Sequence, residues 1–303
     1  MKIQTTLKNA SLFTAAILIA IFMAAPKAQA HSFWINLFES KAHTPGHVIS
    51  ALGWGHTPPL DDLTTSPDGS VTLDTYELVT PDEKHIALGL PQTETKIDSH
   101  ASYANVITGD AGIKKIALLP DSKPGVYQVT ASSKAGFFTR YKDSKGKMRM
   151  AAKPLDKLKG VEQVFESFRY TMNAKSFYAI GEWQRPAALG YDLEIIPETD
   201  LSTVRAGEIV EFSVSFMNKP VSTDSNAINY MTLMSDTFGT PDGFFLSAYI
   251  MDGKARFRIP TAGHWVANVY LPQEVTATGP LKKYAGKCRK NFSAATVSFT
   301  VMP

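Results

Sequence analysis

The chain has 303 residues, of which 31 are basic, 28 are acidic and seven are histidines. Its one cysteine, Cys288, excludes an internal disulfide framework. The three basic residues among the first 30 are lysines, so residues 31–303 hold 28 basic side chains (31 − 3) and 28 acidic ones, with no net charge. The overall charge therefore gives no argument for a nucleic acid or an anionic membrane as partner.

The first 30 residues have the pattern of a secretory signal peptide. Lys2 and Lys8 give a positive start, residues 12–23 form an apolar run, and Ala28-Gln29-Ala30 offers small residues at the cleavage positions. The apolar run is shorter than the roughly 20 residues that a membrane span needs. No other run of spanning length follows. We therefore predict a mature chain that starts at His31 and does not span a membrane.

Alternating apolar and polar residues, separated by Gly, Pro, Asn and Asp, predict short strands along the mature chain. The expected strands are residues 33–37, 48–54, 71–79, 113–119, 126–132, 210–216, 245–250, 255–259, 265–270 and 296–301. Asp252-Gly253 is a typical hairpin turn between two of them. Residues 161–168 instead have the apolar spacing of one short helix.

This pattern predicts an all-β protein. Residues 184–190 form the best linker, and strands of similar length and spacing lie on both sides of it. We predict two tandem immunoglobulin-like β-sandwich domains, residues 31–183 and residues 191–303, after the signal peptide of residues 1–30.

The new N-terminal residue is the main chemical feature. After cleavage His31 carries a free α-amine and an imidazole, and the amine and ring Nδ1 can close a small chelate ring on one metal ion. The α-amine pKa of roughly 7.7–8.0 makes the deprotonation that metal binding requires inexpensive near neutral pH. One more imidazole would give three nitrogen donors, a set that suits a divalent transition metal such as nickel, cobalt, copper or zinc.

Strand pairing decides which histidine could be the second ligand. If residues 33–37 and 48–54 form an antiparallel hairpin, His31 lies opposite Gly53 to Gly55 and beside His56. His47 then lies at the other end of the second strand, about 30 Å away at the usual rise per residue. We therefore prefer His56 as the partner of His31, and keep His47 as the substitute. The glycines around Trp54 suit a backbone bend at such a site.

The other candidate residues have simpler interpretations. His43, His85 and His100 lie in polar segments and are expected to be solvated, and His264 is expected to pack or cap in the second half. Asp61-Asp62 is expected on a solvated loop. Cys288 lies in a basic run and is interpreted as an incidental loop residue, the alternative being a thiol that the cations activate.

The sequence holds no nucleophile elbow, phosphate-binding loop, dinucleotide fingerprint or Cys-x-x-Cys pair. We assign no catalytic residue and predict that the protein is not an enzyme.

Several short motifs are familiar. His31-Ser32-Phe33-Trp34-Ile35 and the segment from Gly53 to Pro59 resemble the exported domain-of-unknown-function family 4198. The segments 134–139, 174–179, 193–198 and 252–265 are similar to later parts of that family. The family is associated with periplasmic components of nickel and cobalt uptake systems. The resemblance implies an exported metal-handling role beside an uptake transporter, with His31 and His56 at the matching positions.

These observations predict a periplasmic protein that binds a transition metal through its mature N-terminus and passes it to a membrane metal-uptake transporter. One alternative is a β-sandwich that binds a membrane receptor or a polysaccharide, with incidental histidines. A second alternative is a copper oxygenase, because an N-terminal histidine chelate also supports oxygen chemistry.

The signal peptide generates the first testable prediction. Intact-mass measurement of the exported protein should give a chain that begins at His31, because Ala28 and Ala30 are the small residues that signal peptidase requires. A mature form that keeps even one residue before His31 would lack the amine–imidazole chelate and would contradict the metal-binding hypothesis.

Overall fold

The computed structural model describes residues 31–40, 46–62, 64–66, 69–92, 96–98, 106–224, 227–239 and 245–303. This part of the chain is all-β, as predicted, and its only helical segments are two short 3-10 turns, η1 (Leu155–Lys157) and η2 (Lys282–Tyr284). No helix in these residues is both long and apolar enough to cross a membrane.

The strands of the first half are β1 (Ser32–Ser40), β2 (Gly46–Gly55), β3 (Thr65–Ser66), β4 (Gly69–Ser70), β5 (Leu73–Val79), β6 (His85–Ala87), β7 (Lys96–Asp98), β8 (Val106–Thr108), β9 (Lys114–Leu118), β10 (Gly125–Ser133), β11 (Gly136–Asp143), β12 (Met148–Ala151) and β13 (Val161–Ile180). Those of the second half are β14 (Leu193–Pro197), β15 (Ile209–Phe216), β16 (Lys219–Pro220), β17 (Tyr230–Ser235), β18 (Leu246–Tyr249), β19 (Lys254–Arg258), β20 (Gly263–Glu274) and β21 (Lys290–Val301).

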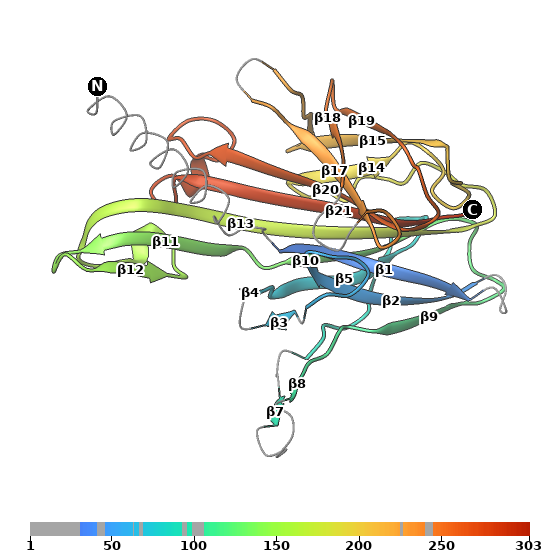
Figure 1. The fold of residues 1–303 in the computed structure, drawn as a ribbon, viewed down its shortest axis with the longest axis horizontal. Helices are drawn as coiled ribbons and strands as arrows, with labels where there is room; N and C mark the ends of the chain where they lie inside the picture. The colour runs from blue at the N-terminus through green and yellow to red at the C-terminus, as the bar shows by residue number, and fades with distance from the viewer. Residues whose placement is uncertain are drawn as a thin grey trace, which may run out of the picture. The chain divides into compact units, whose positions relative to one another are not determined.

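Three sheets form the body of the structure. A ten-stranded sheet has the order β18-β17-β20-β21-β13-β10-β5-β6 (Figure 1). Its other two strands lie off this path: β11 pairs with β13, and β12 pairs with β11. A three-stranded sheet, β1-β2-β9, and a four-stranded sheet, β14-β15-β16 with β19 beside β15, complete the set. Two further ladders, β3-β4 and β7-β8, have two strands each.

The ten-stranded sheet separates two hydrophobic cores. One core packs strands β1, β2 and β9 against β5, β10 and β13, and includes the buried Phe33, Ile35 and Val129. The other packs β14 and β15 against β17, β20 and β21, and includes the buried Phe212 and Trp265. The side chains of β21 alternate between the two faces, as a strand requires. The result is a sandwich-like stack in which one sheet serves both cores.

The segment of residues 184–190, which the sequence analysis interpreted as a linker, contains no strand. Residues 31–303 nevertheless pack as one compact unit, and the ten-stranded sheet takes strands from both sides of the segment. The separation into two immunoglobulin-like domains stays a prediction.

Two sequence-based expectations were wrong in detail. The helix expected at residues 161–168 is the first part of the 20-residue strand β13, where two register shifts against β11 replace the alternation of a regular strand. Asp252-Gly253 does form the predicted two-residue turn, with positive φ at both residues and reciprocal backbone hydrogen bonds between Met251 and Lys254, but the antiparallel pairing stops at that bridge. The strand before it belongs to the ten-stranded sheet and the strand after it to the four-stranded sheet, so the turn carries the chain between sheets.

One ion pair lies inside the stack. The Lys175 ammonium of β13 donates to the Glu194 carboxylate of β14, and both side chains are 1% exposed. The same carboxylate accepts the backbone N–H groups of Leu189 (2.6 Å) and Gly190 (3.1 Å) at the end of the linker. Burial lowers the pKa of Lys175, and the adjacent Glu194 opposes that change. The buried Glu194 carboxylate therefore holds the end of the linker against β14 and β13.

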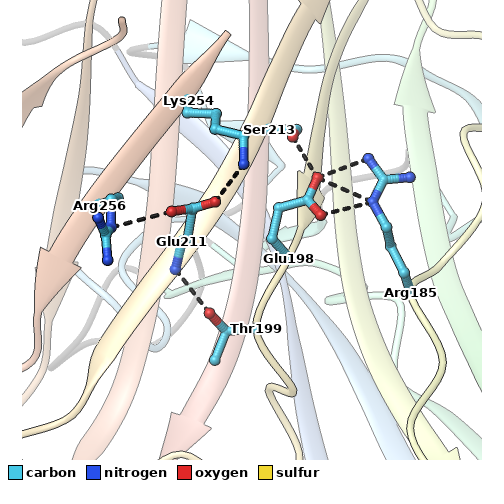
Figure 2. A network of polar contacts seen from close by, with 7 residues as sticks. All are labelled: Arg185, Glu198, Thr199, Glu211, Ser213, Lys254 and Arg256. Carbon is cyan, nitrogen blue, oxygen red and sulfur yellow. Dashed lines mark hydrogen bonds and ion pairs between the residues drawn. The ribbon is translucent and has the colours of Figure 1, made fainter. Parts of the chain in front are cut away.

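A second set of ion pairs lies on the four-stranded sheet at the surface (Figure 2). Arg185 of the linker grips Glu198 with two nitrogens, at 2.9 and 2.8 Å, and holds the pKa of that carboxyl below its usual range. Glu211 of β15 binds Lys254 (2.6 Å) and Arg256 (3.1 Å) of β19. These pairs are partly exposed, and such pairs add little to stability.

The two kinds of ion pair predict different costs of neutralisation. Glu194→Gln keeps the side-chain volume but leaves Lys175 without its buried counter-charge, and should lower the free energy of unfolding by about 3 kcal/mol or more. Glu198→Gln, the matched surface control, should cost less than about 1 kcal/mol. Urea unfolding measures both, and equal losses would contradict the assignment.

The pH dependence of the Glu194→Gln variant has a definite sign. Because burial depresses the pKa of Lys175, the folded variant binds fewer protons than the unfolded chain between the two pKa values of this lysine. Its stability should therefore rise as the pH rises through that window.

Candidate metal centre

The β1–β2 hairpin brings His31 and His56 together. The strands pair antiparallel, from Ser32 opposite Gly55 to Ser40 opposite His47, which confirms the predicted hairpin. The register places His31 level with His56, just beyond the expected position opposite Gly53 to Gly55. His31 directly precedes this ladder and His56 directly follows it. Their ring centroids are 4.4 Å apart, with an angle of 42° between the ring planes.

The backbone of β1 is fixed to β21 up to the residue beside His31. The Thr296 hydroxyl donates to the carbonyl of Phe33 at 2.6 Å, and the Ser298 hydroxyl donates to the carbonyl of Ile35. Ser32 itself accepts from the amide of Asn268 at 3.4 Å. Because strand side chains alternate in direction, these contacts also fix the direction in which the chain enters the site.

The loop that follows β2 is anchored by two buried side chains of β1. The Trp34 indole N–H and the Asn36 amide both donate to the carbonyl of Pro59, at 2.9 and 2.7 Å. The loop then closes on β2, because the Asp62 N–H donates to the carbonyl of Trp54 at 2.9 Å. His56 therefore stands on a short loop held at its middle and at its end.

Two glycines make this arrangement possible. A Cβ at Gly53 would overlap the Trp34 indole, and a Cβ at Gly55 would overlap the Asp61 carboxylate. Gly55 also has φ +128°, a conformation that favours glycine. The ladder continues without a shift through Gly55, so these glycines serve close packing: the Trp34 side chain of β1 and the Asp61 side chain of the loop occupy the space where a Cβ would be.

Two carboxylates face the two imidazoles, and the sequence analysis missed them. Asp62 Oδ2 lies 3.5 Å from Nε2 of His31, and Asp61 Oδ2 lies 3.7 Å from Nδ1 of His56. Asp61 also accepts the backbone N–H of His56 at 2.6 Å. Both aspartates are on a partly exposed loop, as expected, but the loop turns them toward the histidines. Their one sequence signal is that they follow His56 within six residues.

The His31 ring is also stacked on Trp54, with ring centroids 5.1 Å apart and an interplanar angle of 12°. Stacking and the Asp62 contact at Nε2 orient the ring, and Nδ1 is the nitrogen that points away from that carboxylate. Nδ1 is also the nitrogen that can form a chelate ring with the α-amine of a mature N-terminus. A carboxylate on the other ring nitrogen is a common arrangement around metal-binding imidazoles.

The remaining predicted residues lie elsewhere. His47 pairs with Ser40 at the opposite end of β2 from His56, so the structure does not bring it to His31. His85 binds Glu77 at 2.8 Å on an exposed edge. His264 is buried, which lowers its pKa, and packs against Phe38 with ring centroids 6.4 Å apart. His43 and His100 lie outside the described residues.

Cys288 is buried rather than displayed on a loop, and burial raises the pKa of its thiol despite the neighbouring cations. That direction is opposite to the one that an activated thiolate needs.

Side chains alone do not complete a metal site either. Within the described residues no group of three His, Cys, Asp or Glu side chains is placed to hold a metal ion. A three-nitrogen site at the two histidines would therefore need the α-amine of His31.

A cavity of about 530 Å³ lies between β1, β13 and β21, toward the other end of β1 from His31. Leu37, Phe38, Tyr178 and Phe299 are among its lining residues, and no histidine lines it. The imidazole pair is therefore separate from this cavity, with 17% of the His31 side chain and 31% of the His56 side chain exposed.

Fold and site together define an all-β protein of stacked sheets with an imidazole pair where its first hairpin begins and ends. The chain belongs to the family described as Domain of unknown function (DUF4198), whose model matches residues 28–272. This match confirms the family resemblance that the histidine-containing motifs predicted. No curated protein matches the chain.

The packing around Gly55 predicts that adding a methyl group there lowers the free energy of unfolding more than adding one at Gly190. Gly55→Ala should lower the free energy of unfolding by roughly 2–3 kcal/mol, because both the φ angle and the Asp61 carboxylate oppose the Cβ. Gly190→Ala is the matched control, since Gly190 has φ +81° and no atom within 4 Å of its Cβ position. It should cost only about 1 kcal/mol. Urea denaturation measures both, and an equal cost would show that the Asp61 contact contributes nothing.

Proposed function

We propose that the protein is an exported carrier that binds one divalent transition-metal ion at its mature N-terminus and delivers it to a membrane metal-uptake transporter. The observation that carries the proposal is the 4.4 Å separation of the His31 and His56 rings, produced by the hairpin register. In this proposal cleavage before His31 supplies the third nitrogen.

The proposed donor set is the α-amine and Nδ1 of His31 with Nε2 of His56. Asp62 faces the other nitrogen of the first ring and Asp61 faces the other nitrogen of the second ring. Each carboxylate would then orient an imidazole and raise its basicity. Nitrogen donors of this kind suit nickel, cobalt, copper and zinc, and the two neighbouring carboxylates favour a divalent cation electrostatically.

The exposure of the histidines supports delivery rather than permanent storage. A metal ion held by a chain terminus and two partly exposed rings has an open side from which another set of ligands can approach. The loop that bears His56 is anchored at Pro59 and Asp62, so the second imidazole would be in place before the metal arrives. Such preorganisation lowers the entropic cost of binding.

Calorimetry with nickel and copper tests the proposal on four proteins. These are the mature chain, a chain extended by one residue before His31, His56→Ala and His47→Ala. The extension should weaken binding most, because it removes the amine, and the loss should exceed the roughly 10–100-fold that follows loss of an outer-sphere partner. His56→Ala should weaken binding strongly. His47→Ala, the matched control at the far end of β2, should leave it unchanged.

Proton release gives an independent measurement. Binding by the mature chain should release protons near neutral pH, because the α-amine is partly protonated there. Equal affinity for all four proteins would refute the proposed site and favour a non-metal interaction module. A larger loss with His47→Ala than with His56→Ala would refute the ligand pair.

A further inference from the structure

The mature chain has no net charge, yet its basic residues are unevenly distributed. The segment of residues 145–159 has six basic residues and one acidic residue, and the segment of residues 282–290 has five basic residues and no acidic one. Together they carry a formal charge of +10, so the rest of residues 31–303 carries −10. A charge separation of this size creates a strong local electrostatic potential even though the net charge of residues 31–303 is zero.

The fold brings the two segments together from distant parts of the sequence. The Leu155 N–H donates to the carbonyl of Lys287 at 2.7 Å. Arg289 donates from its backbone N–H to the carbonyl of Ser167 and from its guanidinium to the carbonyl of Val164, both at 2.9 Å. We call the exposed side chains of these two segments the basic surface.

Most of this charge has no counter-charge on the protein. Arg149 pairs with Asp143 and Lys290 pairs with Glu274. Among the described residues the other members of the basic surface form no ion pair, and all are exposed. They are Lys145, Lys147, Lys153, Lys157, Lys159, Lys282, Lys283, Lys287 and Arg289. Like charges held this close repel one another, so a polyanionic partner would relieve a cost that the isolated chain bears.

Large apolar side chains are exposed on β12 and on the first part of β13, next to these basic segments. Met148 and Met150, on β12, are 54% and 73% exposed, and Phe165 on β13 is 43% exposed. β12 pairs only with β11, at the end of the sheet (Figure 1). Along the edge strand β12 and the residue before it, Met148 and Met150 alternate with Lys147 and Arg149, so this edge carries apolar side chains on one face and cations on the other.

We propose that the basic surface docks on a membrane rich in anionic phospholipids, with Met148 and Met150 entering the headgroup region. Clustered basic residues bind anionic lipid headgroups, and apolar side chains beside them add interfacial burial. The charge alone would also suit a nucleic acid, but exposed methionines gain nothing against phosphate in water. The proposal concerns residues far from His31 in sequence and does not depend on metal binding.

Vesicle sedimentation tests this proposal with the chain from His31 to Pro303. The probes are vesicles of equal parts phosphatidylglycerol and phosphatidylcholine, and vesicles of phosphatidylcholine alone. The protein should bind the anionic vesicles and not the neutral ones. Binding should weaken steeply between low salt and about 0.5 M salt, because the charges are exposed and are screened by ions.

Three variants distinguish the contributions to vesicle binding of the charge on the basic surface, of the exposed methionines and of net charge in general. Lys282→Gln with Lys283→Gln and Lys287→Gln should weaken binding about a hundredfold, on the order of fivefold for each charge lost. Met148→Ser with Met150→Ser should weaken binding several-fold without changing its salt dependence. Lys84→Gln with Lys115→Gln and Lys219→Gln removes three charges elsewhere and should bind as the unaltered chain does. Thermal unfolding confirms that each variant is folded.

Each contrary outcome would overturn the proposal. No binding to anionic vesicles would show that the basic surface does not recognise lipid. Equal weakening by the two lysine triples would show that net charge rather than this surface is responsible. Tight binding to a soluble polyanion such as heparin, with vesicle binding unaffected by the methionine changes, would reassign the surface to a soluble polyanionic partner.

Discussion

The parallel pairing of β13 with β21 is the interaction on which the rest of the structure depends. It runs from Phe168 opposite Lys290 to Ser176 opposite Ser298, and it joins segments about 120 residues apart. Through it the strands of the first half and those of the second half become one sheet with a core on each face. The hydroxyls that hold β1 belong to β21, so the position of His31 also follows from this ladder.

The parts of the site that could be predicted from the sequence are the local ones. β1 and β2 follow one another in the sequence, and the short segment between them limits the registers of a hairpin, which is why His31 and His56 could be matched without a structure. The positions of Asp61 and Asp62 could not be found in this way. They depend on two side chains of β1, Trp34 and Asn36, reaching the carbonyl of Pro59, and no sequence periodicity reports such a contact.

The same limit explains the errors in the fold. Apolar residues at 161, 164, 165 and 168 have helical spacing, but here the spacing records two places where β13 has an extra residue against β11. Period alone cannot distinguish a bulged strand from a helix of this length. Asp252-Gly253 likewise encodes a local turn and not the sheets that its flanking strands join. Partners distant in sequence decide both cases.

No residue from Arg140 to Glu166 is buried, although this stretch contains most of β11, all of β12 and the start of β13. Neither core has a side chain there, so an insertion, a deletion or a change of charge in the stretch leaves the packing of both cores intact. The stretch can therefore accept such changes at little cost to folding, whereas β1 and β2, which place His31 and His56, contribute buried side chains to a core.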